Sequence, residues 1–121
     1  MKSLLIALAA AATIPVMVKA EPAYLIAQIG VENWDAYMGG YGAAAAPTVF
    51  EYGGRVLTAS MDAMPLEGDW AGNWTVVIEF ESMDKAQAWY ADADYVAARP
   101  LRHETTSVNN LVFAPGFVPP Q

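Results

Sequence analysis

The sequence predicts a single α+β domain with four strands and two helical segments in the order β-α-β-β-α-β. Four short apolar runs, bounded by glycine, proline or polar loops, have the length of strands: residues 23–29, 55–60, 74–81 and 108–113. Between them, apolar residues recur at steps of three or four, the spacing of one face of a helix. Outside the first twenty residues the chain has the length of one domain.

The N-terminal segment differs from the rest of the chain. Lys2 precedes the apolar run 4–18, and Val18-Lys19-Ala20 places small or apolar residues at positions −3 and −1 of a cleavage site. These features are typical of a secretory signal peptide. A membrane anchor is the alternative, but the run is shorter than the roughly 20 residues that span a bilayer, and Pro15 interrupts it. We expect cleavage after Ala20, a periplasmic or secreted protein, and no stable membrane insertion afterwards.

The composition of the remaining chain excludes several kinds of partner and site. Without Lys2 and Lys19, four Lys or Arg residues remain against thirteen Asp or Glu, a net charge of −9. Such a chain repels phosphate backbones and anionic membrane surfaces, so we expect no nucleic acid partner. The chain has no cysteine, which excludes disulfides, thiol nucleophiles and thiolate metal sites.

The first helical segment has conflicting signals. Asn33 can cap a helix that starts at the next residue. One face of this helix would carry Trp34, Met38, Tyr41, Ala45, Val49 and Tyr52. However, each of the three glycines between residues 39 and 42 costs about 1 kcal/mol relative to alanine in a helix interior, and Pro47 removes a hydrogen bond. We therefore predict a kinked helix that ends at Gly53-Gly54.

The second half of the chain repeats the strand and helix signals. Residues 61–73 form a long polar loop, and Ser82 can cap a helix directly after the third strand. Asp92-Ala93-Asp94 is a second capping point, from which a short helix runs to about His103 with a bend at Pro100.

The order of these elements is that of a ferredoxin-like sandwich, in which helices cover one face of an antiparallel four-stranded sheet. We divide the chain into a signal peptide (1–20), a domain (21–114) and a flexible, proline-rich tail (115–121).

Five segments carry a resemblance to a known family. They are AYLIAQIGVENWDAYMGGYG, YGGRVL, LEGDW, VVIEFESMDKAQAWYADADY and AARPLRH, in unbroken order over nearly all of residues 22–114. With them the chain resembles the domain of unknown function 1330 family, which is similar to the dimeric α+β barrel proteins. The resemblance implies that fold and a homodimer in which two sheets form a barrel. It brings no accepted reaction and no catalytic residues.

The chain departs from the family's pattern at two places. Family members usually have Ser-Pro-Glu-Tyr where this chain has Asp92-Ala93-Asp94-Tyr95. They often carry a basic residue just before the third apolar run, where this chain has Trp74. A family site that used this basic group would not carry over to this chain.

Glu79 is a carboxylate within the most apolar predicted strand. If the loop between the second and third strands closes symmetrically, one sheet face carries three opposed pairs: Arg55–Glu79, Leu57–Val77 and Ala59–Thr75. The other face, which the helices cover, would carry Trp74, Val76, Ile78 and Phe80 with Val56 and Thr58. The structural interpretation of Glu79 is a cross-strand ion pair with Arg55, worth roughly 0.2–1 kcal/mol. The functional interpretation is a general base or ligand clamp, buried if a second subunit covers this face.

His103 is the only histidine, and its unperturbed pKa lies near neutrality. At the end of the last helix a cation is favoured by the helix dipole, which is the structural interpretation; a catalytic role is the alternative. One histidine without cysteine does not make a zinc site. A single axial haem ligand stays open but no motif supports it, and we predict no metal and no cofactor.

Aromatic residues at helical spacing form the last candidate group: Trp34, Tyr37, Tyr41, Trp89, Tyr90 and Tyr95. Their structural role is in the core. Their functional role would be in an apolar cleft between helices and sheet, with tyrosine hydroxyls as polar contacts. The candidate ligand or pocket residues are Arg55, Glu79, His103, Tyr41 and Trp34.

We therefore expect an exported homodimer that is structural or binds a small molecule. The alternative, by fold analogy alone, is a cofactor-independent oxygenase or isomerase acting on a small organic molecule. A deep, closed pocket that contains tyrosine hydroxyls, His103 or Glu79 would favour the enzyme, and a filled cleft would favour the binding or structural role.

Overall fold

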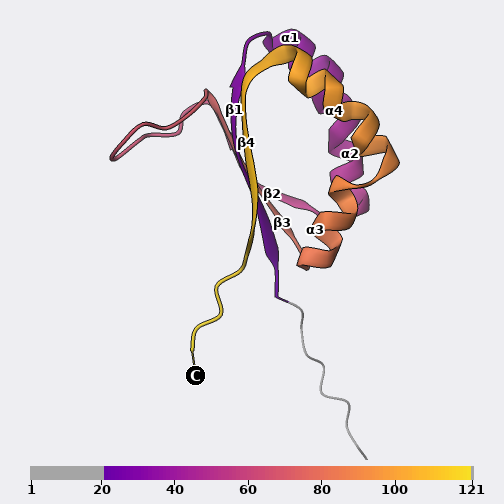
Figure 1. Cartoon of the computed structure of the whole chain (residues 1–121), viewed down its shortest axis with the longest axis vertical. Helices are drawn as coiled ribbons and strands as arrows, with labels where there is room; N and C mark the ends of the chain where they lie inside the picture. The colour runs from indigo at the N-terminus through magenta and orange to yellow at the C-terminus, as the bar shows by residue number, and fades with distance from the viewer. Residues whose placement is uncertain (1–20, 121) are drawn as a thin grey trace, which may run out of the picture.

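Four antiparallel strands form one sheet in the order β2-β3-β1-β4. They are β1 (Ala23–Val31), β2 (Arg55–Ser60), β3 (Trp74–Phe80) and β4 (Thr106–Pro115). The computed structural model describes residues 21–120, and Figure 1 shows all of their helices on one face of this sheet. The predicted ferredoxin-like α+β arrangement is confirmed.

The predicted signal peptide at 1–20 lies outside the described residues. Within the described chain no helix is long and apolar enough to cross a bilayer.

The first helical segment is continuous but changes its winding. It consists of α1 (Trp34–Ala36), the π-helix η1 (Tyr37–Gly42) and α2 (Ala43–Glu51). The Asn33 side chain accepts the Ala36 N–H at 3.0 Å, as an N-cap should. The glycines from which a kink was predicted lie in this π-helical turn, a wide winding that proteins use in short pieces.

The segment ends at the predicted glycine pair. Gly53 has φ 74°, a left-handed conformation that glycine adopts without a steric penalty. Its N–H donates to Phe50 O at 3.0 Å, and the Gly54 N–H donates to Val49 O at 2.9 Å. These two bonds form a Schellman motif, which satisfies the last carbonyls of α2 and turns the chain into β2.

Two more helices, α3 (Met83–Tyr90) and α4 (Ala93–Thr105), begin at the predicted caps. Ser82 Oγ accepts the Lys85 N–H at 3.1 Å. Asp92 Oδ2 accepts the N–H groups of Asp94 and Tyr95 at 2.9 and 3.2 Å.

Helix α4 and strand β4 are both longer than the predicted elements, and β4 follows α4 without a loop. Pairing with β1 explains the longer strand, because Val31 pairs with Thr106 and Ala23 with Pro115. The first residue of the predicted tail, Pro115, therefore belongs to β4. Beyond it, the Gly116 N–H still donates to Pro22 O at 2.8 Å.

The core lies between the sheet and the helices. Along β1, the residues at every second position are buried against the helices: Ala23, Leu25, Ala27 and Ile29. Trp89 of α3 is at the centre, with its ring 5.4 Å from Phe80 and 4.2 Å from Tyr95. Its indole N–H donates to Thr48 Oγ1 at 3.0 Å, so the buried nitrogen has a partner.

The pairing of β2 with β3 agrees with the prediction at one end only. Arg55 lies opposite Glu79, as predicted, but Leu57 is an extra residue, so Thr58 rather than Leu57 pairs with Val77. Ala59 then pairs with Val76 rather than Thr75. The predicted pairs Leu57–Val77 and Ala59–Thr75 are wrong, because a β-bulge shifts the register by one residue. Ala59 consequently lies on the helix-covered face and Thr58 on the other.

Candidate functional site

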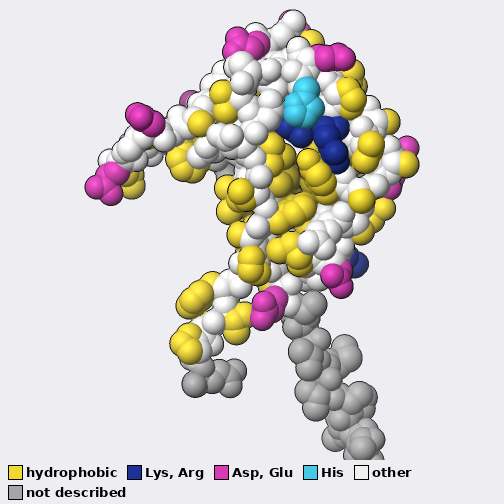
Figure 2. Space-filling view, in the orientation of Figure 1, with side chains coloured by type: hydrophobic (Ala, Val, Ile, Leu, Met, Phe, Trp, Pro, Cys, Tyr) yellow, Lys and Arg dark blue, Asp and Glu magenta, His cyan; other side chains and the backbone are white. Residues whose placement is uncertain are grey.

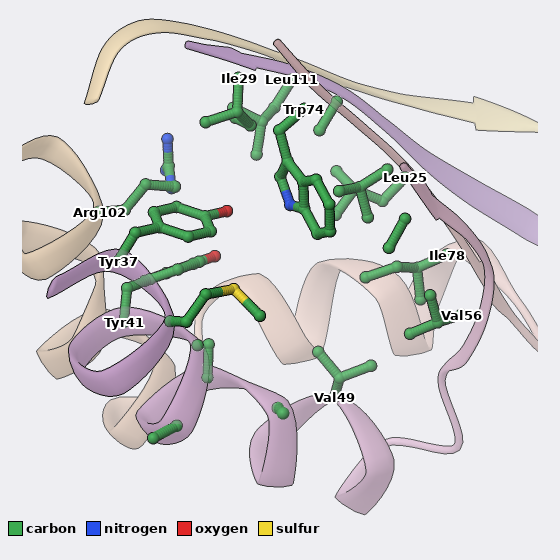
Figure 3. A pocket seen from close by; sticks show the side chains of 18 of the residues that line it. Leu25, Ile29, Tyr37, Tyr41, Val49, Val56, Trp74, Ile78, Arg102 and Leu111 are labelled. Carbon is green, nitrogen blue, oxygen red and sulfur yellow. The ribbon is translucent and has the colours of Figure 1, made fainter. Parts of the chain in front are cut away.

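A pocket of about 420 Å³ lies between the sheet and the first helical segment. Figure 3 shows aliphatic side chains of the sheet, such as Leu25 and Ile78, facing Val49 of α2 across it. The space exists because many of the facing residues are small: Ala27, Gly42, Ala43, Ala45, Ala46 and Ala59. Larger side chains at these positions would fill the gap to the usual density of a protein interior.

The polar groups of the pocket gather at one end. Tyr37 and Tyr41 come from η1, and Arg102 comes from α4. Figure 3 shows these three side chains together, away from the aliphatic end at Leu25 and Val56. The rings of Tyr37 and Tyr41 are 5.3 Å apart, and the Arg102 guanidinium lies 5.7 Å from the centre of the Tyr41 ring.

Arg102 is a buried cation, with 2 % of its surface exposed. Its Nη1 donates to Asn109 Oδ1 at 2.5 Å. Its Nε is buried and has no hydrogen-bond partner among residues 21–120. A buried, unpartnered donor of this kind is rare in folded proteins and needs an explanation.

The two tyrosines are protonated at neutral pH. Burial raises the pKa of Tyr37 to about 12, although the nearby Arg102 charge lowers it in part. Burial, together with Tyr95, raises the pKa of Tyr41 further. The hydroxyls of Tyr41 and Tyr95 form a hydrogen bond of 2.9 Å. Both pocket tyrosines can therefore donate or accept hydrogen bonds but are poor bases.

The structure brings one of the sequence-predicted site residues, Tyr41, into the pocket. Trp34 lies beside the pocket, with its ring 5.3 Å from that of Trp74. His103 is exposed on α4, and Arg55 and Glu79 lie on the opposite face of the sheet. The structure therefore does not gather the five candidates into one site.

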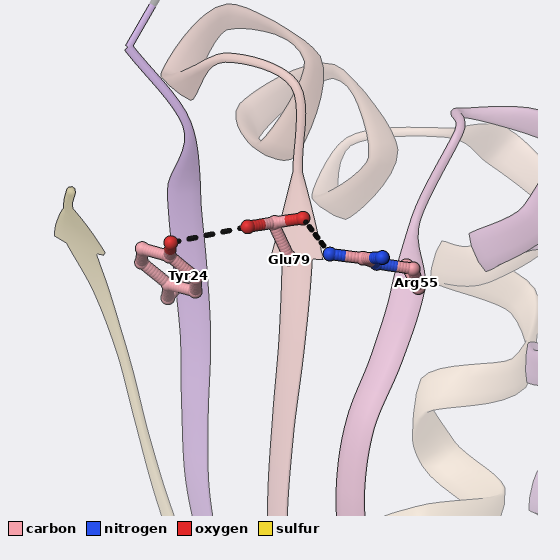
Figure 4. A network of polar contacts seen from close by, with 3 residues as sticks. All are labelled: Tyr24, Arg55 and Glu79. Carbon is pink, nitrogen blue, oxygen red and sulfur yellow. Dashed lines mark hydrogen bonds and ion pairs between the residues drawn. The ribbon is translucent and has the colours of Figure 1, made fainter.

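Arg55 and Glu79 form the predicted cross-strand ion pair (Figure 4), with Nη2 and Oε1 2.8 Å apart. The Tyr24 hydroxyl donates to the other carboxylate oxygen at 3.1 Å, and this bond raises the pKa of Tyr24. The Arg55 side chain is 71 % exposed and that of Glu79 is 26 % exposed. In the single chain these three side chains form a solvent-exposed network on the surface of the sheet.

The residue that sequence reasoning missed is Arg102. A signal was present, because Tyr95, Ala98 and Arg102 are spaced by three and four residues and all three are buried on one face of α4.

Figure 2 shows hydrophobic side chains in a hollow beside α4, with basic side chains and the histidine at its edge and acidic side chains further out. Within residues 21–120 no group of three or more acidic or histidine side chains could hold a metal ion.

The fold is shared with several solved structures. A protein of unknown function from Rhodopseudomonas palustris matches with a TM-score of 0.67 and 18% identity, over 82% of this chain and 85% of that chain. A dimeric protein of unknown function and ferredoxin-like fold from Bacteroides fragilis matches with a TM-score of 0.53 and 16% identity, over 78% and 96%. SnoaB, a cofactor-independent oxygenase from Streptomyces nogalater, matches with a TM-score of 0.57 and 15% identity, over 84% of this chain and 96% of that chain.

Sequence comparison identifies the family. A comparison with curated proteins found no match. The family described as domain of unknown function (DUF1330) matches residues 22–117. This range includes every strand and helix described above. The chain belongs to the DUF1330 family.

Proposed function

We propose that the protein binds one small, largely apolar organic molecule in the pocket between the sheet and the first helical segment. The observation that supports this is a cavity of about 420 Å³ with apolar walls and a single polar end. Small-molecule sites in proteins have volumes of roughly 300–1,000 Å³ and the same division between apolar walls and a few polar groups.

The pocket orients its ligand. Leu25, Ile78 and Val49 would contact the apolar body, which leaves water when it binds. The polar group of the ligand would point toward Tyr37, Tyr41 and Arg102. The pocket is open on one side, at exposed residues of α2 and β2 such as Ala46 and Ala59, so a ligand can enter without unfolding the domain.

A pair of substitutions on α2 tests this proposal. Ala46 and Ala44 are both exposed, but Ala46 lines the pocket and Ala44 does not. With the neutral probe 1-naphthamide in a calorimetric titration, Ala46→Trp should weaken binding at least tenfold because the indole fills the entrance. Ala44→Trp should stay within twofold of the wild type. Equal loss in both variants, or no binding by the wild type of either naphthamide or its anionic counterpart 1-naphthoate, would refute the proposal.

A second candidate function is cofactor-independent oxygenation, and the fold shared with SnoaB is the observation that favours it. The Tyr37 phenol and the Arg102 guanidinium could stabilise an oxyanion on a substrate. Among the described residues, however, the pocket lining contains no carboxylate or imidazole to accept a proton, so we place binding first. Oxygen uptake with easily oxidised polycyclic phenols, abolished by Ala46→Trp, would reverse this order.

The protein would act as a homodimer. Figure 1 shows no helix or strand of residues 21–120 over the sheet face away from the helices. This face carries an apolar strip of Ile26, Val77 and Val112, which are neighbours in the strand pairing. Val112 is 57 % exposed. A second copy placed face to face would cover the strip, and the dimeric Bacteroides protein of the same fold supports this arrangement.

Export completes the proposal. Its support is the signal-peptide pattern of residues 1–20. N-terminal sequencing of protein from its native envelope should begin at Glu21, and a sequence that begins at Met1 would contradict export with cleavage.

A further inference from the structure

We propose that the pocket's ligand is an organic monoanion, a carboxylate on an apolar body, whose charge is bound by Arg102. This inference rests on the proposed binding function and adds the chemical class of the ligand.

Arg102 carries a positive charge inside the protein. A guanidinium remains protonated in proteins at any accessible pH, and this one is 98 % buried because 2 % of its surface is exposed. The ion pairs among the described residues are Arg55–Glu79 and Lys85–Glu81, so no carboxylate of this part of the chain neutralises Arg102. A buried charge is costly unless it is paired, so the site is incomplete without a negative group.

The contacts of Arg102 within residues 21–120 do not supply this negative group. Arg102 donates to the amide oxygen of Asn109, a neutral acceptor. The Asn109 amide nitrogen in turn donates to Thr106 Oγ1 at 2.8 Å, which fixes the orientation of the side chain. Asn109 therefore holds the guanidinium in place but does not neutralise its charge. The buried Nε–H group has no hydrogen-bond acceptor among residues 21–120.

The neighbouring arginine on α4, Arg99, also has a buried Nε without a hydrogen-bond partner among residues 21–120, but it does not line the pocket. The Arg99 guanidinium lies 3.9 Å from the centre of the Tyr90 ring and donates to Tyr90 O at 2.6 Å. These contacts give it a cation–π partner and a carbonyl acceptor outside the pocket. Among the described residues Arg102 is the cation that lines the pocket.

A carboxylate matches the hydrogen-bond donors at the polar end of the pocket. A guanidinium binds carboxylates through parallel N–H donors, and protonated phenols add O–H donors. Tyr37 and Tyr41 supply such hydroxyls at the same end of the pocket. A single cation balances one negative charge, and the apolar walls exclude water from the rest of the molecule. Together these features select a monocarboxylate with a hydrophobic body.

The experiment compares 1-naphthoate with 1-naphthamide, which share shape and differ in charge. Titration of the wild-type protein at pH 7 should show naphthoate binding at least tenfold more tightly than naphthamide. Arg102→Met should reduce this ratio to about one while naphthamide still binds. Arg99→Met, which removes the neighbouring guanidinium, should change the ratio by less than twofold.

A second variant keeps the test decisive if Arg102→Met does not fold. Asn109→Asp places a carboxylate at the 2.5 Å contact and so gives Arg102 an internal partner. It should also abolish the preference for naphthoate, although Arg102 is still present.

The outcomes separate the two proposals. If naphthamide binds and naphthoate binds no better, the anion inference is wrong and the binding function stands. If neither probe binds, both fail. If naphthoate is preferred but the preference survives Arg102→Met or Asn109→Asp, or is lost in Arg99→Met, Arg102 is not the anion's partner.

Discussion

At the scale of single residues, the presence of the Glu79 carboxylate in the apolar strand β3 has a structural explanation. Glu79 lies on the face of β3 away from the pocket, between Arg55 of β2 and Tyr24 of β1. Both carboxylate oxygens have a donor, and the partly exposed position lets water share the charge. It is an ion pair near the end of the sheet face and not part of the pocket.

Glu79→Gln should therefore lower the free energy of unfolding by less than about 1 kcal/mol, as expected for an exposed ion pair. Urea denaturation of the variant and the wild type measures the difference. A loss of about 3–5 kcal/mol would show instead that the pair is buried in the assembled protein, since removal of one partner of a buried pair has that effect.

At the scale of elements, the start of α4 depends on an ionised side chain. The Tyr52 hydroxyl donates to Asp92 at 2.9 Å, and the N–H groups of Asp94 and Tyr95 donate to its other oxygen. The hydrogen bond from Tyr52, followed by the backbone donors, lowers the pKa of Asp92 below its ordinary value of 3.8. This contact also joins the end of α2 to the start of α4.

A lowered pKa in the folded state gives stability that is present above the unfolded value and lost as the pH falls through the folded value. The difference in unfolding free energy between wild type and Asp92→Asn should be constant above about pH 5 and shrink below about pH 4, near the unfolded pKa. Tyr52→Phe, which removes the main donor, should reduce this pH dependence. A difference that does not change with pH would contradict the assignment.

The π-helix η1 contains glycines that lower its stability. Its glycines at positions 39 and 40 have open space where a Cβ would lie. Because of this open space, no packing constraint in the single chain explains either glycine. Glycine in a helix interior is about 0.5–1 kcal/mol less favourable than alanine, so both residues lower the stability of the helix.

Gly39→Ala should raise the free energy of unfolding by about 0.5–1 kcal/mol. Gly53→Ala is the matched control, and it should lower stability by about 1–2 kcal/mol because φ is 74° there. Urea denaturation measures both. A destabilised Gly39→Ala would indicate that the space beside η1 is occupied in the assembled protein.

The sequence predicted the helices and strands better than it predicted the strand register and the pocket. Asn33, Ser82 and Asp92 predicted three helix starts because capping is a local interaction. The bulge at Leu57 could not be predicted, since a period-two pattern does not reveal an extra residue. Arg102 was not recognised as a pocket residue, because the pocket depends on the distance between the helices and the sheet.

At the scale of the whole molecule, the two faces of the sheet have different roles. One face and the helices enclose the pocket, and the other presents the apolar strip of Ile26, Val77 and Val112. The bulge in β2 contributes to both, since it directs Ala59 to the pocket and Thr58 to the open face.

Val77→Lys should separate the proposed dimer, because it places a charge in the middle of the covered strip. Light scattering at micromolar concentration should give twice the chain mass for the wild type and the single mass for the variant. Ala88→Lys, on the exposed surface of α3, should remain dimeric. A monomeric wild type would rule out the dimer.

The burial of Arg102 in an acidic protein has a kinetic consequence. The chain has a net charge of −7, so an organic anion is repelled as it approaches and attracted only once it is inside the pocket. Salt shortens the range of the outer repulsion from about 30 Å at 0.01 M to about 8 Å at 0.15 M, and it screens a buried contact much less. Stopped-flow association of naphthoate should therefore become faster as the salt concentration rises, while its dissociation rate hardly changes, which is the reverse of electrostatic steering.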